Sequence, residues 1–418
     1  MQFISESMED FETSITAIDL GSSQIKVVIA RLMGEDEIEI IGIGVAPNSG
    51  VKVGGIVNIE ATIRSIEQAI HFAELKAGME IREVIVNITG KSISSRNHKS
   101  VVAITNKERI VNEDDIRRVI EAAEPRISNN EMILHVLSKE FAVDDQTNIK
   151  DPLGMTGVRL EAEVHIVTAG NTLVSNLEKC ISGTGLGLID KVLSSFASGE
   201  AVLTSGEKDF GIAVVDIGAG ISDIVIYEEG GICFSSSVPF GGEKISQDIS
   251  IGLKTPLESA EAIKKKFGHV LIDEIDPTSK IELPSMAGKP ANSIPRQNLV
   301  KIIEPRVREI LEMINAEIEK TGKKSILTGG VILTGGTSLL PGIETLAEEI
   351  FGVSVMVTKP AGLSGLTELV ASPEFSTAVG LIKYAARNMV PSHSESGYAN
   401  AASGSAFKKV WNWIEKNL

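Results

Sequence analysis

Two short segments of this chain each combine an apolar strand, an Asp-x-Gly turn and a second apolar strand. The first spans residues 17–28 and contains Asp19, and the second spans residues 215–225 and contains Asp216, 197 positions later. Glycine allows a tight turn to adopt positive φ and brings backbone N–H groups close to an anion. One such turn is common in hairpins, whereas two predict related half-molecules that face each other across the phosphates of a nucleotide.

A third glycine turn follows a buried strand at residues 332–342. Gly335 and Gly336 would let the backbone pass close to a flat base or a ribose, where a Cβ would collide. Each hairpin alone could be only a structural turn. In this order and spacing, the three turns resemble the ATPase motifs of the actin and heat-shock chaperone superfamily. The resemblance implies an α/β, ribonuclease-H-like duplicated fold with two lobes around a nucleotide cleft.

The superfamily order assigns a role to each turn. We expect Asp19 and Asp216 to bind Mg²⁺ through its water shell, because Mg²⁺ keeps most of its waters and contacts few carboxylates. The β- and γ-phosphates of ATP would accept hydrogen bonds from the hairpin turns, at Gly21, Ser22, Ser23, Gly218, Gly220 and Ser222. The nucleotide site would also include two glycine pairs, Gly241–Gly242 and Gly335–Gly336. Lys26 is expected to flank the first turn without contacting phosphate.

Glu261 and Lys264 lie at positions i and i+3 of a predicted helix and therefore share one face. An acid and a base so spaced can bind the hydroxyls of a ribose and flank an adenine, although an ordinary surface ion pair is the alternative. The superfamily order favours the nucleotide. Residues 165–171 hold no glutamine to orient an attacking water, so we expect slow or negligible ATP hydrolysis.

Composition narrows the classes of function. The chain has 418 residues and a formal net charge of −16, which argues against general nucleic-acid binding. Its two cysteines, Cys180 and Cys233, lack the spacing of a metal site or a disulfide framework and are expected to be reduced. Residues 1–12 are acidic and do not resemble a signal peptide, and no apolar run is long enough to span a membrane. These features predict a cytoplasmic protein.

Periodicity predicts the elements around the turns. Residues 58–76 form a helix with Asn58 as N-cap and one apolar face, made of Ile63, Ile66, Ala69, Ile70 and Ala73. Residues 84–165 are expected to form an inserted module whose helix begins after Asn112 and ends at Pro125. Residues 158–166 alternate between apolar and polar types, which predicts a strand with one wet face and places His165 in solvent.

The last residues have the pattern of an amphipathic helix behind a linker. Residues 389–404 are rich in glycine and serine, whereas residues 405–418 place apolar side chains at helical spacing. The apolar stripe consists of Phe407, Val410, Trp411, Ile414 and Leu418. Lys408, Lys409 and Lys416 form a cationic face, and Trp413 lies at the boundary between the two faces. Such a helix lies in the plane of an anionic membrane. A helix that packs back on the body is the alternative, but the linker and the tryptophans favour the membrane.

The chain as a whole resembles the FtsA family, the bacterial cell-division relatives of actin. The resemblance extends from about residue 15 to the end of the chain and rests on residues 134–136, 157–160, 214–218, 260–264, 302–306, 331–336 and 376–381. It implies an ATP-binding scaffold that polymerises on the cytoplasmic face of the inner membrane at the division site. Such a scaffold anchors filaments of the tubulin-like FtsZ and recruits later membrane proteins of the divisome.

The resemblance also implies a subdomain plan, in which an inserted subdomain 1C replaces the 1B subdomain of actin. The expected ranges are 1A at 12–83, 166–195 and about 355–388, 1C at 84–165, 2A at 196–242 and about 310–354, and 2B at 243–309. In the family the C-terminal peptide of FtsZ docks on 2B, where Arg296 and Arg306 would suit an acidic and apolar tail. Late divisome proteins would bind 1C.

Two alternatives remain open at this stage. A sugar or acid kinase of the same fold would need a catalytic base in the cleft, and it leaves the terminal helix unexplained. An actin-like adaptor of pilus assembly shares the inserted subdomain but needs no lipid-binding helix.

Overall fold

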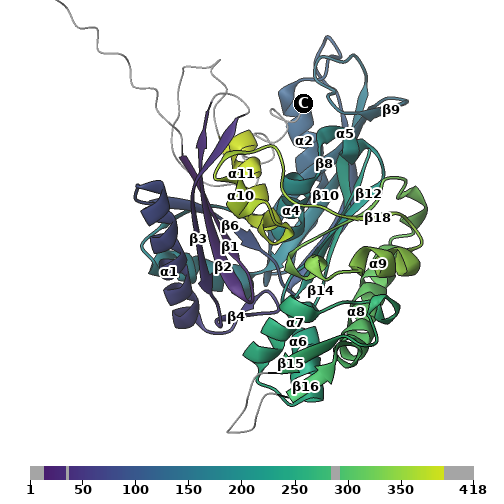
Figure 1. Cartoon of the computed structure of the whole chain (residues 1–418). Coiled ribbons are helices and arrows are strands. Elements are labelled where there is room, and N and C mark those ends of the chain that lie inside the picture. The colour runs from purple at the N-terminus through teal and green to yellow at the C-terminus, as the bar shows by residue number, and fades with distance from the viewer. Residues whose placement is uncertain (1–13, 34–36, 284–291, 390–418) are drawn as a thin grey trace, which may run out of the picture.

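The computed structural model describes residues 14–33, 37–283 and 292–389, which form two lobes and an insert (Figure 1). The predicted linker from residue 390 onward and the predicted membrane helix lie outside these residues.

The first lobe is built on a six-stranded mixed sheet with the strand order β11-β6-β1-β2-β3-β19. Helix α1 packs on β2 and β3, and helix α11 packs on β1, β2 and β6. The two helices cover the sheet, so β1 and β2 are apolar and buried along most of their length. The bounds are β1 (Ser14–Leu20), β2 (Gln24–Leu32), β3 (Ile38–Pro47), β4 (Val51–Lys52), β5 (Gly55–Ile56), α1 (Ile59–Ala77), β6 (Glu83–Ile88), α3 (Asn171–Gly183), β11 (Gly187–Leu193), β19 (Ser364–Gly365) and α11 (Ser376–Met389).

Helix α1 follows the sequence prediction closely. The Asn58 side chain accepts a hydrogen bond from the backbone N–H of Ala61, which satisfies one of the free N–H groups of the first turn. Gly78 ends the helix in the left-handed region, with φ 68°. The predicted buried face is confirmed at Ile66, Ala69, Ile70 and Ala73, while Ile63 is only partly buried.

The insert has a four-stranded antiparallel sheet with the order β7-β10-β8-β9, and α2 packs on β7 and β10. Its bounds are β7 (Ile93–Ala103), α2 (Glu113–Ala123), β8 (Glu131–Val143), β9 (Gln146–Ile149) and β10 (Arg159–Gly170). Asn112 caps α2 in a capping box with Asp115. We expected the insert to begin at residue 84, but β6 pairs with β1 and β11 in the first sheet, so the sheet of the insert starts at β7.

The second lobe repeats the plan of the first. Its sheet has the order β14-β13-β12-β17-β18, and its own apolar core includes the buried side of α8. The bounds are β12 (Ile212–Ile217), β13 (Ser222–Glu228), β14 (Gly231–Val238), α6 (Gly242–Leu253), α7 (Leu257–Phe267), β15 (Lys280–Leu283), β16 (Asn292–Pro295), α8 (Arg296–Lys320), β17 (Gly330–Thr334), α9 (Ile343–Phe351) and β18 (Val355–Val357). Strand β18 pairs with β17, so the second lobe extends past its expected end at residue 354.

Helices α4 (Ser194–Val202) and α11 pack on each other between the two sheets (Figure 1). Helix α11 contacts strands of the first sheet, and α4 contacts β12 and β13 of the second. The short helices α5 (Ser205–Asp209) and α10 (Thr367–Val370) complete the connections. The helix pair therefore forms the joint between the lobes.

The insert also contacts the second lobe, and this contact overturns the prediction for His165. The side chain is 1% exposed, and its Nε2 lies 2.9 Å from Ser235 Oγ on β14 while Nδ1 lies 2.6 Å from Asn97 Oδ1 on β7. Burial, with a contribution from His135, lowers the pKa of His165 to about 3, so the ring is neutral. The polar face of β10 is covered by β14, which no pattern within residues 158–166 reveals.

Candidate functional site

The two Asp-x-Gly segments form antiparallel hairpins at corresponding places in the two sheets. In the first, Asp19 on β1 pairs with Lys26 on β2, and in the second, Asp216 on β12 pairs with Asp223 on β13. The second turn is closed by a hydrogen bond of 3.0 Å from Gly218 N to Ile221 O. Both hairpins match the sequence prediction.

The hairpin turns face each other. A Cβ on Gly220 would lie 2.6 Å from Ser22 Oγ and 3.0 Å from the backbone nitrogen of Val53, so only glycine lets the second turn approach the first lobe this closely. Both turns line a cavity of about 360 Å³, a size typical of small-molecule sites. The predicted residues that line it are Asp19, Gly21, Ser22, Ser23, Asp216, Gly218, Gly220, Glu261, Lys264, Gly335 and Gly336.

The third turn closes one side of this cavity. Gly335, which follows β17, has φ 84°, and a Cβ there would lie 2.3 Å from Asp216 Oδ1 and 2.7 Å from Ile217 O. Glycine is required on both counts, because the backbone is left-handed and because Asp216 leaves no room. Near Gly336, by contrast, a Cβ would make only ordinary contact with Glu374 at 3.7 Å.

Asp216 is held by both helices of the interlobe joint. Ser198 Oγ on α4 donates to Asp216 Oδ2 at 2.6 Å, and Thr377 Oγ1 on α11 donates to the same oxygen at 2.9 Å. Burial raises the pKa of Asp216, and the nearby Asp19 carboxylate adds to the rise, while the two hydroxyl donors oppose it.

Asp19 has a different set of partners. Lys26 Nζ lies 3.2 Å from Asp19 Oδ2, and Asn87 Nδ2 donates to Oδ1 at 3.1 Å. Lys26 is 9% exposed and lines the cavity, so it is part of the site and does not merely flank the turn as we expected. Its ammonium is therefore positioned beside the turn that faces the cavity.

Asp223 is a third carboxylate of the cavity, and the sequence analysis did not identify it. Thr89 of the first lobe donates to Asp223 Oδ1 at 2.6 Å, and Ser237 donates to the same atom at 2.5 Å. Burial, with the charges of Asp216 and Asp19, raises the pKa of Asp223 to about 7 despite these donors. The Thr89–Asp223 hydrogen bond joins the two lobes directly across the cavity.

The Glu261–Lys264 pair is not an ordinary exposed ion pair. Lys264 is 7% exposed, and its Nζ lies 2.7 Å from Glu261 Oε2 and 2.9 Å from Gly242 O. Burial lowers the pKa of Lys264 although Glu261 opposes the shift. Burial acts to raise the pKa of Glu261, but the charge of Lys264 and the hydrogen bonds from Lys264 and Ser246 together outweigh it, so the pKa is lowered. Both side chains line the cavity, and their contact with a ribose stays a prediction.

Three of the residues predicted for the nucleotide site do not line the cavity. Ser222 is fully buried, and its hydroxyl donates to Phe240 O at 2.7 Å, so it faces the interior of the lobe. A Cβ on Gly241 would lie 2.5 Å from Gly218 O, and one on Gly242 would lie 2.3 Å from Thr337 Oγ1. These two glycines allow α6 to pack closely behind the second turn.

The sequence analysis missed other residues that line the cavity, and the position of two of them in the sequence could have identified them. Asn87 lies near the end of the buried strand β6 and Thr89 directly after it. This strand pairs in parallel with β1, and polar residues at the carboxyl end of a parallel pair are often ligand contacts. Within the described ranges, no group of three or more histidine, cysteine or acidic residues is arranged to hold a metal ion directly. The site can therefore offer backbone N–H groups, hydroxyls and separate carboxylates, which suit a hydrated cation and a polyphosphate.

Comparisons with known proteins place this geometry in a family. Residues 213–380 match the family model described as cell division protein FtsA, and residues 90–168 match the SHS2 domain inserted in FtsA. A cell division protein FtsA from Pseudomonas aeruginosa is 37% identical over 415 residues, which cover 97% of this chain and 98% of the relative. The chain belongs to the FtsA family. It is thus a cell-division, actin-like protein. Membership of this family does not support the kinase and pilus-adaptor alternatives.

Solved structures support the same fold. The PilM–PilN type IV pilus biogenesis complex has a TM-score of 0.61 at 17% identity, with 88% of this chain and 98% of that chain covered. MreB5 of Spiroplasma citri bound to ADP has a TM-score of 0.54 at 12% identity, with 89% and 95% covered. At these identities the likeness shows the actin-like fold alone.

The two arginines expected to bind an FtsZ peptide already have partners. Arg296 Nε donates to Phe267 O at 2.8 Å and so caps the last turn of α7, while Arg306 pairs with Asp248 on α6 and with Glu309 one turn further along α8. Arg296 is half-buried rather than fully exposed. Among the described residues of this FtsA-family chain, no helix is both long and apolar enough to cross a bilayer.

The raised pKa of Asp223 predicts how stability depends on pH in the absence of ligand. The folded state binds the proton more tightly than the unfolded state between the ordinary pKa of 3.8 and about 7, so stability falls as pH rises through this range. Asp223→Asn keeps the acceptor for Thr89 but removes the charge. We expect its free energy of unfolding to gain about 3 kcal/mol on that of the wild type between pH 5 and pH 8.

Urea unfolding at several pH values measures this difference. Asp145→Asn is the matched control, because Asp145 is fully exposed on the insert. Parallel pH profiles for the wild type and Asp223→Asn would show that Asp223 is ionised in the folded protein.

Proposed function

We propose that the cavity between the lobes binds ATP with Mg²⁺. The observation that carries this proposal is that two glycine turns, each beside an aspartate, face each other across one cavity and make contact at Gly220 and Ser22. Bound Mg²⁺ would neutralise phosphate charge and order the triphosphate.

The residues present fit this ligand. Backbone N–H groups of the turns at Gly21–Ser23 and at Ala219 and Gly220 would donate to phosphate oxygens, and Lys26 adds a positive charge beside them. Asp19 and Asp216 would accept hydrogen bonds from the waters of Mg²⁺, in keeping with separate carboxylates and no compact metal cluster among the described residues. The adenosine would lie beside Gly336, where a Cβ meets little, and near the Glu261–Lys264 pair.

ATP would act mainly by holding the lobes together. The cavity is bordered by residues of both lobes, and Asp223 already bonds Thr89 across it. A ligand bound to both turns adds interactions that only the closed arrangement can make, and it therefore shifts the population toward that arrangement. We further propose that hydrolysis of the bound ATP is slow or negligible.

Asp216→Ala tests the nucleotide site. The variant removes a carboxylate from the proposed Mg²⁺ water shell, while Ser198 and Thr377 keep each other as hydrogen-bond partners at 3.0 Å. We expect affinity for a fluorescent ATP analogue to fall at least about tenfold, or 1.4 kcal/mol.

The titration is repeated in EDTA, where the wild type should fall to the level of the variant if Asp216 acts through Mg²⁺. Asp145→Ala, on the exposed surface of the insert, is the control. Equal affinities of Asp216→Ala and wild type in Mg²⁺ would place the triphosphate elsewhere.

We propose further that the chain is a scaffold at the division site, on the cytoplasmic face of the inner membrane. In this proposal it polymerises, anchors FtsZ filaments through 2B, recruits later divisome proteins through 1C and binds anionic lipids through residues 405–418. Membership of a cell-division, actin-like family supports this role, and the amphipathic pattern behind a linker supports the membrane contact.

Arg296→Glu tests the docking of the FtsZ peptide on 2B. Reversing this charge should weaken binding of an acidic and apolar FtsZ C-terminal peptide at least about tenfold, because electrostatic attraction is replaced by repulsion. Arg308→Glu, which reverses a charge on another face of α8, is the control.

Melting temperature separates peptide binding from the role of Arg296 at the end of α7, since loss of that cap lowers stability without acting on the peptide. A variant that binds the peptide as the wild type does at low salt would exclude this part of 2B as the docking site.

Trp411→Glu tests the membrane contact. The substitution removes a large apolar side chain from the stripe and puts a carboxylate at the lipid boundary, a combined loss of about 3–5 kcal/mol. We expect cosedimentation with anionic vesicles to be abolished while ATP binding and melting temperature stay unchanged.

Asn412→Glu is the matched control, because the neighbouring residue adds the same charge to the polar face. Persistent cosedimentation of Trp411→Glu together with a large drop in melting temperature would mean that the helix packs permanently on the body.

A further inference from the structure

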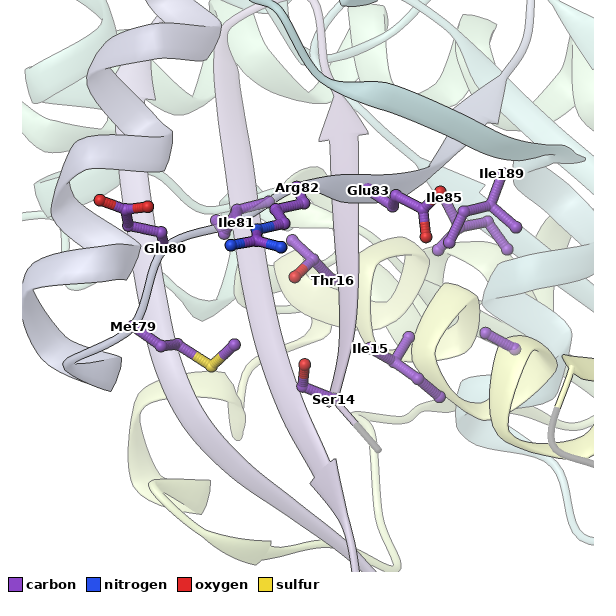
Figure 2. Close-up of a pocket in the computed structure, with 11 residues that line it drawn as sticks. Ser14, Ile15, Thr16, Met79, Glu80, Ile81, Arg82, Glu83, Ile85 and Ile189 are labelled. Atoms are coloured by element: carbon purple, nitrogen blue, oxygen red, sulfur yellow. The ribbon is translucent and has the colours of Figure 1, made fainter. Parts of the chain in front are cut away.

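A second, larger cavity of about 810 Å³ lies in the first lobe, apart from the nucleotide cleft (Figure 2). It is bordered by the start of β1, the segment between α1 and β6, and the last turns of α11. None of its lining residues lines the cavity between the lobes. The function proposed above leaves it unused.

Its walls combine apolar side chains with the hydroxyl residues Ser14 and Thr16, and its rim is charged. Apolar side chains line it from strands β1, β6 and β11 and from the segment between α1 and β6: Ile15, Met79, Ile81, Ile85 and Ile189. Ile189 is 47% exposed although it is a large aliphatic residue. Glu80, Arg82 and Glu83 are exposed and form the rim, and in the view of Figure 2 the Arg82 side chain lies between those of Glu80 and Glu83. A ligand with an apolar face and positive charges beside it would suit this surface.

We propose that this cavity holds the chain's own C-terminal segment, residues 405–418, when no membrane is present. This inference rests on the membrane-binding role proposed for the same segment. The cavity becomes a second binding place for the apolar stripe, so the helix is either docked on the body or inserted in lipid.

The position of the cavity favours this occupant. Ala385 of α11 lines it, and the described part of α11 ends only four residues later, at Met389. Residues 390–404 then connect to the segment, and a flexible linker of that length has a root-mean-square span of about 20 Å. A segment tethered so close to its site has an effective concentration of the order of millimolar, which turns even weak docking into a populated state.

The chemistry favours it as well. The stripe of Trp411 and its neighbours matches the aliphatic walls, and the three lysines of the segment, against one glutamate, complement Glu80 and Glu83. The other nearby segment, residues 1–13, continues from Ser14 at the cavity wall but carries four acidic residues and no basic one. Its charge would meet repulsion at the same rim.

Docking would compete with lipid for the same face. The apparent membrane affinity of the full chain is then reduced by the fraction of helices that are free. If nine-tenths of the helices are docked, a variant that opens the cavity binds vesicles about tenfold more tightly.

Tryptophan fluorescence tests this directly, because Trp411 and Trp413 are the two tryptophans of the whole chain. In the full-length protein without vesicles, we expect blue-shifted emission and weak quenching by acrylamide, compared with a free peptide of residues 405–418. Ile189→Arg puts a charge into the apolar wall and repels the lysines, so it should shift the emission to the red and raise quenching toward the level of the peptide. Ile251→Arg, at a site on α6 that is 76% exposed, adds the same charge elsewhere and should change neither.

Two further measurements complete the test. Glu80→Gln with Glu83→Gln should raise quenching partway, and Ile189→Arg should bind anionic vesicles more tightly than Ile251→Arg. Wild-type tryptophans as accessible as those of the peptide would overturn the proposal, as would unchanged quenching in Ile189→Arg. Quenching that rises on dilution would overturn it too, because the helix would then pack on a second copy. A protein that docks its tryptophans but ignores lipid would instead overturn the membrane role and leave the docking intact.

Discussion

The hydrogen bonds to Asp216 are the constraint on which the arrangement of the lobes depends. Its carboxylate stands at the end of β12, accepts from Ser198 on α4 and from Thr377 on α11, and leaves room only for glycine at residue 335. One side chain therefore fixes the second hairpin, both helices of the joint and the third glycine turn relative to each other. A half-buried carboxylate in such a place is costly unless its acceptors are filled, and the two hydroxyls both donate to one of its oxygens.

The concentration of negative charge gives the cleft its chemical character. Asp19, Asp216 and Asp223 line one cavity, and burial raises the pKa of two of them. These three carboxylates repel one another when they are ionised. A bound divalent ion with its waters would reduce this repulsion. The Thr89–Asp223 bond ties this relief to the contact between the lobes, since the donor and the acceptor come from different lobes.

The glycine turns could be predicted from sequence because the local backbone conformation or a close contact requires glycine there. The two hairpins, the close contact between their turns and the turn at Gly335 were predicted on this basis. The caps of α1 and α2 were predictable for the same reason, because Asn58 and Asn112 act within one turn of the chain. What could not be predicted depends on partners distant in sequence. The face of β10 that carries His165 is covered by β14. The Ser222 hydroxyl donates to Phe240 O, and the Arg296 guanidinium donates to Phe267 O at the end of α7. Lys26 lies between these cases, since its pairing with Asp19 follows from the hairpin register alone.

Helix α11 connects the two cavities of the molecule. Thr377 near its start binds Asp216 at the nucleotide cleft, and Ala385 near its end lines the second cavity. Eight residues of α-helix span about 12 Å, and this stretch is packed against α4 and the first sheet, so it moves as a rigid element. A displacement of α11 at Asp216 would therefore also shift the wall beside Ala385. Since the chain continues from the end of α11 toward residues 405–418, the element that touches the cleft is also the one that leads to the segment proposed to bind the membrane.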